Sequence, residues 1–218
     1  MVTATAAAPA YGPRLLGRFE PNAPDWHAAR RWRIGGSEIA AVMGWSPFQT
    51  RDELLAQKLA GNPTEKHTKA IVRGHLLEPA ILAWGAQEKG YLYDPQASAA
   101  TWLHPLWDFA LYNPDGFTYD GLLIECKSVA DRTTDKGWGR AGTDAIPLYY
   151  RAQVAWGMAV LGLPETRLLC LHGATNGRPD LDIAEYRIKR DRQLEIRLLT
   201  AGRAFAAELA AARKEHHE

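Results

Sequence analysis

Residues 113–127 read NPDGFTYDGLLIECK, and this stretch decides the fold. Its first four residues are of the types that form a tight turn, and its last six are apolar enough for a strand of a sheet. Alternation along a strand places Leu123, Glu125 and Lys127 on one face. We therefore expect the turn to lead into a hairpin that returns Asp115 beside Glu125 at the edge of the sheet.

Helical and strand patterns alternate on both sides of this stretch. Before it, the spacing of apolar residues predicts helices over 26–33, 38–43, 50–60 and 69–89. Short strands are predicted over 91–93, 100–103 and 107–112. After it, the pattern predicts an apolar helix over 147–161, strands over 166–172 and 181–189, and an amphipathic helix over 192–214. The fold class that follows is α/β, a mixed sheet flanked by helices.

Caps and helix breakers set the expected ends of three helices. Ser37 and Thr50 are suitable N-caps, and Gly61 is a suitable stop for the helix that Thr50 begins. Pro79 has no N–H to donate, so we expect a kink or a restart of its helix near Glu78.

Length and composition are those of one globular domain. The chain has 218 residues, 46% hydrophobic and 23% charged, and a formal net charge of +1. We expect a single domain over 1–218, with 1–13 as a disordered tail and no secretory leader or membrane span. Two cysteines are too few for a disulfide framework and suit a reducing cytoplasm. A near-neutral charge means that any DNA-binding surface must be a local patch.

Two carboxylates that meet at a sheet edge are suited to a hard divalent cation. Mg²⁺ prefers oxygen ligands and keeps several waters, so Asp115, Glu125 and the carbonyl of Cys126 suffice. Lys127 on the same face can orient an attacking water and balance charge on a phosphate. The alternative is structural: an Asp in such a turn often only bends the chain, and alternating Glu and Lys often form a solvated face.

A third carboxylate strengthens the metal interpretation. Glu78 lies in the segment RGHLLEP, residues 73–79, among apolar neighbours and beside a proline. Alone it would be an exposed helical glutamate, but together with Asp115 and Glu125 it is a candidate metal ligand, direct or through water. The chemistry that these groups favour is metal-assisted phosphodiester hydrolysis.

Six blocks in the same order resemble the YqaJ-type viral recombinases, relatives of the phage lambda exonuclease. The resemblance covers about residues 26–162, and its blocks are RIGGSEIAA (33–41), WSPF (45–48), RGHLLEP (73–79), PDG (114–116), ECK (125–127) and YYRAQV (149–154). It implies a restriction-endonuclease-like core. It also implies two Mg²⁺ ions, with Mn²⁺ as a possible substitute, held by Asp115, Glu125, the Cys126 carbonyl and Glu78, with Lys127 as the catalytic lysine.

The resemblance further implies a pocket for a 5′-phosphate that contains Arg30 and Ser37. A guanidinium and a hydroxyl beside a helix N-terminus suit an anion, although spacing alone leaves Arg31 and Arg33 as alternatives to Arg30. Gln153 matches a family glutamine, for which we expect an orienting or DNA-contacting role. The alternative is a partly buried glutamine bonded to backbone.

The function that the resemblance implies is a Mg²⁺-dependent 5′-to-3′ exonuclease on linear double-stranded DNA. It would leave 3′ single strands for recombination, assemble as a ring-shaped homotrimer, and hand its product to a single-strand annealing protein. Its place would be the cytoplasm of a bacterial cell, in a phage or prophage context. Two alternatives remain open: an endonuclease or nickase with the same core, and a DNA-end-binding module without catalysis.

Overall fold

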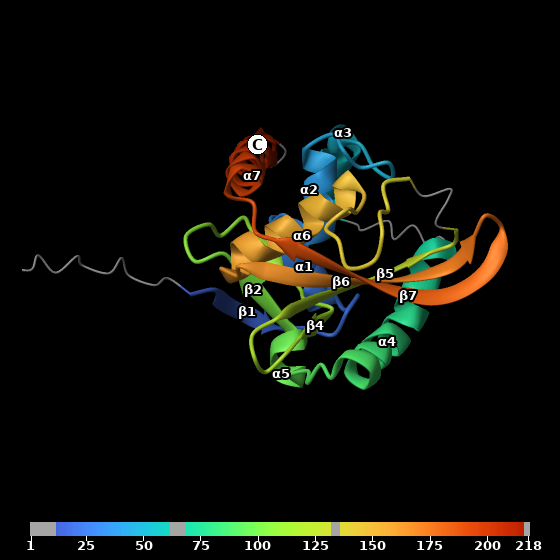
Figure 1. Ribbon diagram of the computed structural model, residues 1–218. Helices are drawn as coiled ribbons and strands as arrows, with labels where there is room; N and C mark the ends of the chain where they lie inside the picture. The colour runs from blue at the N-terminus through green and yellow to red at the C-terminus, as the bar shows by residue number, and fades with distance from the viewer. Residues whose placement is uncertain (1–11, 62–68, 132–135, 216–218) are drawn as a thin grey trace, which may run out of the picture.

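Two sheets and seven helices make up the computed structural model, which describes residues 12–61, 69–131 and 136–215 (Figure 1). Nearly all of the predicted tail over 1–13 lies outside these residues. The helices are α1 (Pro24–Arg31), α2 (Gly36–Val42), α3 (Arg51–Ala60), α4 (Lys69–Lys89), α5 (Pro95–Ser98), α6 (Leu148–Leu161) and α7 (Arg192–Glu215). The strands are β1 (Arg14–Arg18), β2 (Ala100–Leu103), β3 (Leu111–Tyr112), β4 (Gly116–Phe117), β5 (Leu123–Val129), β6 (Glu165–Thr175) and β7 (Arg178–Lys189).

The larger sheet has the strand order β4-β5-β6-β7, and the smaller has the order β1-β2-β3. Strand β5 pairs parallel with β6, whereas the other pairings between the named strands are antiparallel. A parallel pair needs a crossover, and here α6 provides it. The expected mixed sheet flanked by helices is confirmed.

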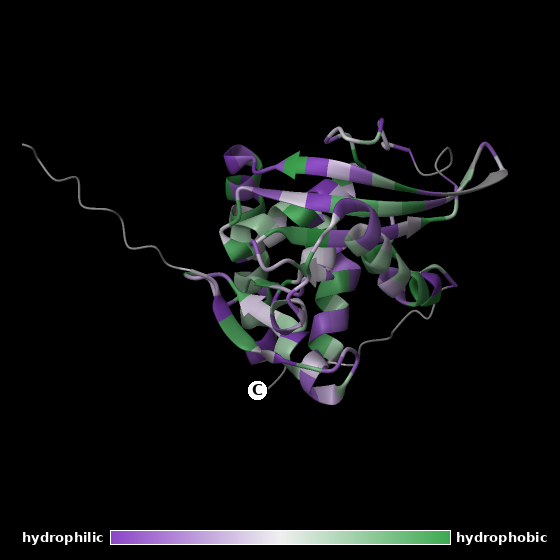
Figure 2. Ribbon diagram, turned by 60° about the horizontal axis from the view of Figure 1, so that its bottom comes forward, coloured by the Kyte–Doolittle hydropathy of each residue, from purple (hydrophilic) through white to green (hydrophobic). Residues whose placement is uncertain are grey.

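Helices cover both faces of the larger sheet. Helix α6 packs on the face that carries Leu168 and Cys170, and α4 packs on the face that carries Ile124 and Leu169. Figure 1 shows α4 on the opposite side of the strands from α6 and α7. Figure 2 shows polar and apolar residues alternating along the strands, as their period of two requires.

Helix α6 is the centre of the core. Its sequence is almost wholly apolar, and Trp156 in its middle is completely buried. The indole Nε1 donates to the backbone carbonyls of Ile34 (3.2 Å) and Leu111 (3.1 Å), so one side chain joins the segment before α2 to β3. Since buried indole N–H groups need partners, this position suits tryptophan better than an aliphatic residue.

Two local predictions were wrong. Residues 91–93 form no strand, although Tyr93 makes an isolated bridge to Thr118. The strand predicted over 107–112 shrinks to β3. Helix α4 is one helix on both sides of Pro79, so the restart predicted as one alternative does not occur; a proline costs one hydrogen bond, which a helix of 21 residues tolerates.

Ser37 is not an N-cap. Helix α2 begins at Gly36, two residues earlier than predicted, which places Ser37 in the first turn, where it is exposed. The side chain of Glu38 instead accepts a hydrogen bond from the backbone N–H of Gly35 (2.6 Å). Thr50, in contrast, caps α3 as predicted and accepts from the N–H of Glu53 (3.2 Å).

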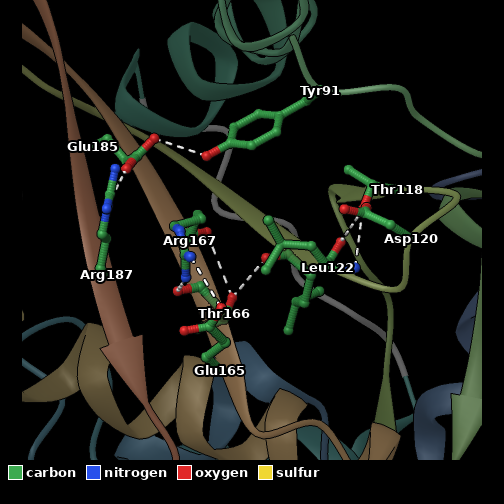
Figure 3. A network of polar contacts seen from close by, with 10 residues as sticks. Tyr91, Thr118, Asp120, Leu122, Glu165, Thr166, Arg167, Glu185 and Arg187 are labelled. Carbon is green, nitrogen blue, oxygen red and sulfur yellow. Dashed lines mark hydrogen bonds and ion pairs between the residues drawn. The ribbon is translucent and has the colours of Figure 1, made fainter. Parts of the chain in front are cut away.

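The outer edge of β7 is partly covered by the segment before α6. The N–H of Gly142 donates to the carbonyl of Glu185 (2.8 Å), and the N–H of Arg187 donates to the carbonyl of Thr143 (3.0 Å). On the α4 side, Glu185 accepts from Tyr91 Oη (2.7 Å) and from Arg187 Nε (2.6 Å) (Figure 3). Burial raises the pKa of Glu185, but the bonds from Tyr91 and Arg187 outweigh it and lower the pKa. Backbone hydrogen bonds from the segment before α6, together with the side-chain bonds of Glu185, therefore hold strand β7 in place.

In the described ranges no helix combines the length and the apolar character that crossing a membrane would need.

Candidate active site

The turn before β4 returns Asp115 to β5, as the sequence predicts. Gly116 pairs with Ile124, so the residue before Gly116 faces the residue after Ile124. Asp115 Oδ2 accepts a hydrogen bond from the backbone N–H of Cys126 (2.8 Å), which fixes the carboxylate against the strand. Asp115 and Glu125 are thus brought together by a short hairpin alone.

Glu125 is a buried carboxylate surrounded by donors. Its side chain is 1% exposed, and it accepts hydrogen bonds from Tyr112 Oη, Lys127 Nζ and Gln153 Nε2. The three donors come from β3, β5 and α6. Burying a charge is costly unless it is paired and hydrogen-bonded, and here both conditions are met. Gln153 therefore bonds a carboxylate, which contradicts the alternative of a glutamine bonded to backbone.

Tyr112 is the site residue that sequence reasoning missed. It is 1% exposed, and burial together with the nearby charges of Glu125 and Asp115 raises the pKa of its hydroxyl well above the usual value. The hydroxyl is therefore a permanent donor to Glu125. A signal was available: the residue lies three positions before Asp115, at the end of a strand that leads into the same turn.

Glu78 reaches the same region from α4. Burial raises the pKa of Glu78, and the charge of Glu125 raises it further. Burial likewise raises the pKa of Asp115 well above its usual value, with added repulsion from Glu125 and Glu78. The three carboxylates therefore act on one another electrostatically, and an arrangement of this kind is stabilised by a cation.

Lys127 brings a positive charge to the carboxylates of Glu125 and Asp115. Its Nζ contacts Glu125 Oε1 and donates to the carbonyl of Cys126 (3.1 Å), and it lies over the ring of Tyr150 (5.5 Å). Burial alone would lower the pKa of Lys127, but Glu125 and Asp115 outweigh it and raise the pKa. The ammonium thus occupies the two oxygens that were predicted as metal ligands.

The donor set fits a hard cation, with one adjustment. Asp115, Glu78, Glu125 and the Cys126 carbonyl offer only oxygen atoms, which Mg²⁺ and Mn²⁺ prefer. Yet within the described part of the chain no three His, Cys, Asp or Glu side chains already stand at metal-binding distance from one another. Lys127 contacts two of these oxygens, so it would share them with a bound cation.

A second group of predicted residues lies where α1 ends and α2 begins. Arg30 Nη1 donates to Asn113 Oδ1 (2.9 Å), two residues before Asp115, and its guanidinium lies over the ring of Trp26 (4.5 Å). Ser37, in the first turn of α2, is exposed. Arg30 is therefore tied to the segment that carries Asp115.

The side chains of the other two candidates, Arg31 and Arg33, donate hydrogen bonds to backbone carbonyls. Arg31 Nη2 donates to the carbonyl of Leu59 (3.2 Å), and Arg33 donates to the carbonyls of Asp108 (3.1 Å) and Ala29 (2.7 Å). Both side chains hold loops and helix ends together. Of the three, Arg30 is the one whose side chain bonds a residue next to the acidic cluster.

Comparisons with known proteins agree with this geometry. Residues 25–164 match the family described as YqaJ-like viral recombinase domain. The protein YqaJ of Bacillus subtilis (strain 168) is 29% identical over 155 residues, which are 70% of this chain and 46% of that protein. The chain therefore spans about half the length of this curated relative.

Solved structures show the same architecture. The alkaline exonuclease LHK-Exo from Laribacter hongkongensis superimposes with a TM-score of 0.70 at 25% identity, covering 89% of this chain and 96% of that one. Its complex with dAMP superimposes with a TM-score of 0.69 at 26% identity, covering 88% and 95%. The expected restriction-endonuclease-like core is confirmed by this likeness.

Proposed function

Because the chain belongs to the YqaJ-like viral recombinase domain family, we propose that it is a metal-dependent deoxyribonuclease that digests linear duplex DNA from its ends. The observation that carries the proposal is the hairpin that sets Asp115 beside Glu125 on β5, with the Lys127 ammonium on Glu125 and with Glu78 near enough for its charge to act on both. The likeness to an alkaline exonuclease and to its dAMP complex supports the class, since dAMP is the kind of mononucleotide that such an enzyme releases.

We assign the chemistry to the side chains around Glu125. Asp115, Glu125, the Cys126 carbonyl and Glu78 would hold Mg²⁺ or Mn²⁺, two ions in our proposal. When bound, the ions lower the pKa of water and neutralise the scissile phosphate. Lys127 orients the attacking water and balances charge on the phosphate. Tyr112 and Gln153 act through Glu125 by fixing the direction of its carboxylate.

We assign the terminal 5′-phosphate to Arg30 and Ser37. A guanidinium offers paired donors to phosphate oxygens, and a hydroxyl adds one more. The bond from Arg30 to Asn113, two residues before Asp115, supports the proposal that the phosphate is recognised close to the site of hydrolysis. A site that recognises a 5′-phosphate implies digestion in the 5′-to-3′ direction, which leaves a 3′ single strand for recombination.

We further propose a ring-shaped homotrimer that encloses DNA and passes its product to a single-strand annealing protein in the bacterial cytoplasm. A chain of net charge +1 cannot attract DNA by bulk charge, whereas three copies would combine their local basic patches. Light scattering coupled to size-exclusion chromatography, which weighs the particle in solution, tests the trimer.

Digestion of end-labelled DNA tests the function. With Mg²⁺, the chain should release labelled mononucleotides from linear duplex, spare closed circular duplex, and do neither in EDTA. Cleavage of closed circles would instead support the endonuclease or nickase alternative. The end-binding alternative predicts that linear duplex is bound but never shortened.

The variant Asp115→Asn tests the site. It should bind duplex ends as the parent does and lose at least about a thousandfold in rate, because it lacks a carboxylate that holds the cation. Asp52→Asn is the matched control, since Asp52 is exposed on α3. Undiminished nucleotide release by Asp115→Asn would reject the assignment.

A further inference from the structure

Lys58 is a buried lysine that neither the acidic cluster nor the arginine pocket uses. It lies on α3 and its side chain is 5% exposed. Its Nζ donates to the carbonyls of Arg33 (2.6 Å) and Arg30 (3.3 Å) and to Glu38 Oε1 (2.9 Å). An ammonium has three donors, and all three are used, so Lys58 has none left for a ligand.

The acceptors of Lys58 belong to the two segments that carry the proposed phosphate site. The carbonyls of Arg30 and Arg33 lie at the C-terminal end of α1, where a positive charge is favourable. Glu38 is in the first turn of α2, one residue after Ser37. One ammonium therefore fastens the end of α1 to the start of α2.

Glu38 is placed between Lys58 and the pocket. Its second oxygen accepts from the N–H of Gly35, and the Arg30 guanidinium packs on that glycine so closely that a Cβ at position 35 would lie 2.4 Å from Arg30 Nη2. Burial raises the pKa of Glu38, but the positive charges of Lys58 and Arg30 outweigh it and lower the pKa. Glu38 thus has two positively charged side chains near it: Lys58, which is held by three hydrogen bonds, and Arg30, which belongs to the proposed phosphate pocket.

We propose that Lys58 is a positioning residue for the terminal-phosphate site: it neutralises Glu38, so that the Arg30 guanidinium remains available to the 5′-phosphate of a DNA end. The inference rests on the phosphate site of the proposed function and deepens it. Without Lys58, the remaining cation near Glu38 is Arg30, and a buried carboxylate without its partner attracts a neighbouring guanidinium strongly. Arg30 would then pair with Glu38 instead of with DNA.

Binding in EDTA separates this effect from catalysis. Fluorescence anisotropy would give the Kd of a labelled duplex with a 5′-phosphate and of the same duplex with a 5′-hydroxyl, for the parent, Lys58→Met, Lys58→Met/Glu38→Gln and Arg30→Ala. Lys89→Met is the matched control, because Lys89 lies at the far end of α4 over the ring of Trp84. The parent should prefer the phosphorylated end by about tenfold or more, and Arg30→Ala should abolish that preference.

The expected result is a loss of the preference in Lys58→Met and recovery of most of it in the double variant, which has no unpaired carboxylate to compete for Arg30. Lys89→Met should keep the parent's preference. A general loss of folding weakens binding of both duplexes equally and leaves their ratio unchanged, and such an unchanged ratio in Lys58→Met overturns the proposal. Equal loss of preference in the single and double variants overturns it too.

Two outcomes for the parent separate this inference from the function on which it rests. Preference for phosphorylated ends without any digestion in Mg²⁺ would reject the exonuclease and leave the role of Lys58 supported by the binding ratios. Digestion without any preference for a phosphate would reject the terminal-phosphate site and the role of Lys58 with it.

Discussion

At the scale of single residues, the site is organised by what surrounds Glu125. A carboxylate that is 1% exposed must be held by several donors, and the structure gives it a tyrosine, a lysine and a glutamine. Tyr112 differs from the other two because it is fully buried, whereas Lys127 and Gln153 are partly exposed. Its hydroxyl donates to Glu125 from within the core.

Tyr112→Phe should therefore weaken both the fold and the reaction. The change leaves one buried carboxylate oxygen without a donor, and we expect the free energy of unfolding to fall by about 1 to 2 kcal/mol. Turnover should fall by about tenfold because the Glu125 carboxylate is less well oriented. Urea denaturation and the end-label assay measure the two effects. Tyr119→Phe is the control, since Tyr119 is 70% exposed; a Tyr112→Phe variant as stable as this control would contradict the prediction.

Spacing along the chain predicts contacts between residues whose relation is local, whereas Gln153 was predicted only from the family resemblance and Tyr112 was missed. Asp115, Glu125 and Lys127 are linked by one turn and one strand, so their spacing predicts that they lie together. The bond between Lys58 and Glu38 joins α3 to α2 across 20 residues of sequence, and only the packing of α3 reveals it. The choice among three arginines likewise needed the structure, because neighbours in sequence have identical chemistry.

At the scale of elements, glycines allow α2 and α6 to approach the ring of Tyr112. A Cβ at Gly36 or at Gly157 would lie 2.5 Å from atoms of that ring. The aromatic ring is buried and cannot move aside, so both helices need glycine at these positions. The close approach brings Gln153, one turn before Gly157, to Glu125.

Gly157→Ala and Gly74→Ala form a matched pair that tests this packing. Both glycines are inside helices, where alanine is intrinsically favoured by up to about 1 kcal/mol. Gly74 has nothing within 4 Å of an added Cβ, so its substitution should raise the free energy of unfolding. Gly157→Ala should lower it by about 1 to 3 kcal/mol, because the methyl group overpacks the core. Equal effects in urea denaturation would refute the role of the ring.

Most elements were predictable because their apolar spacing and breakers are strong. Helices α3, α4, α6 and α7 lie within one or two residues of their predicted bounds. Strand β1 was missed, since RLLGR has two arginines and a glycine and shows no clear alternation. It is an edge strand, and its place depends on pairing with β2 more than on its own composition.

At the scale of the whole molecule, helix α6 joins the two sheets, because it packs in the hydrophobic clusters of both. Residues of α6 take part both in the cluster that includes Ile34 and Tyr112 and in the cluster that includes Leu168 and Tyr186. The split into two sheets could not be predicted, because sequence patterns identify strands but not their partners.

We therefore expect the chain to unfold in a single cooperative step, as one domain. Denaturant curves followed by far-ultraviolet circular dichroism and by tryptophan fluorescence should coincide, since Trp156 is buried where the two sheets meet α6. Separate midpoints for the two signals would contradict a single domain.

The cover that Gly142 and Thr143 provide for β7 has a consequence for anyone who engineers this protein. An open strand edge is a template on which another chain can add a strand, and self-templated addition leads to aggregation. The segment before α6 follows β5 in the chain, and an engineer who wants to open the proposed active site would consider shortening it. Removing it would uncover backbone groups at Glu185 and Arg187, and the altered chains would then adhere to one another through their sheets.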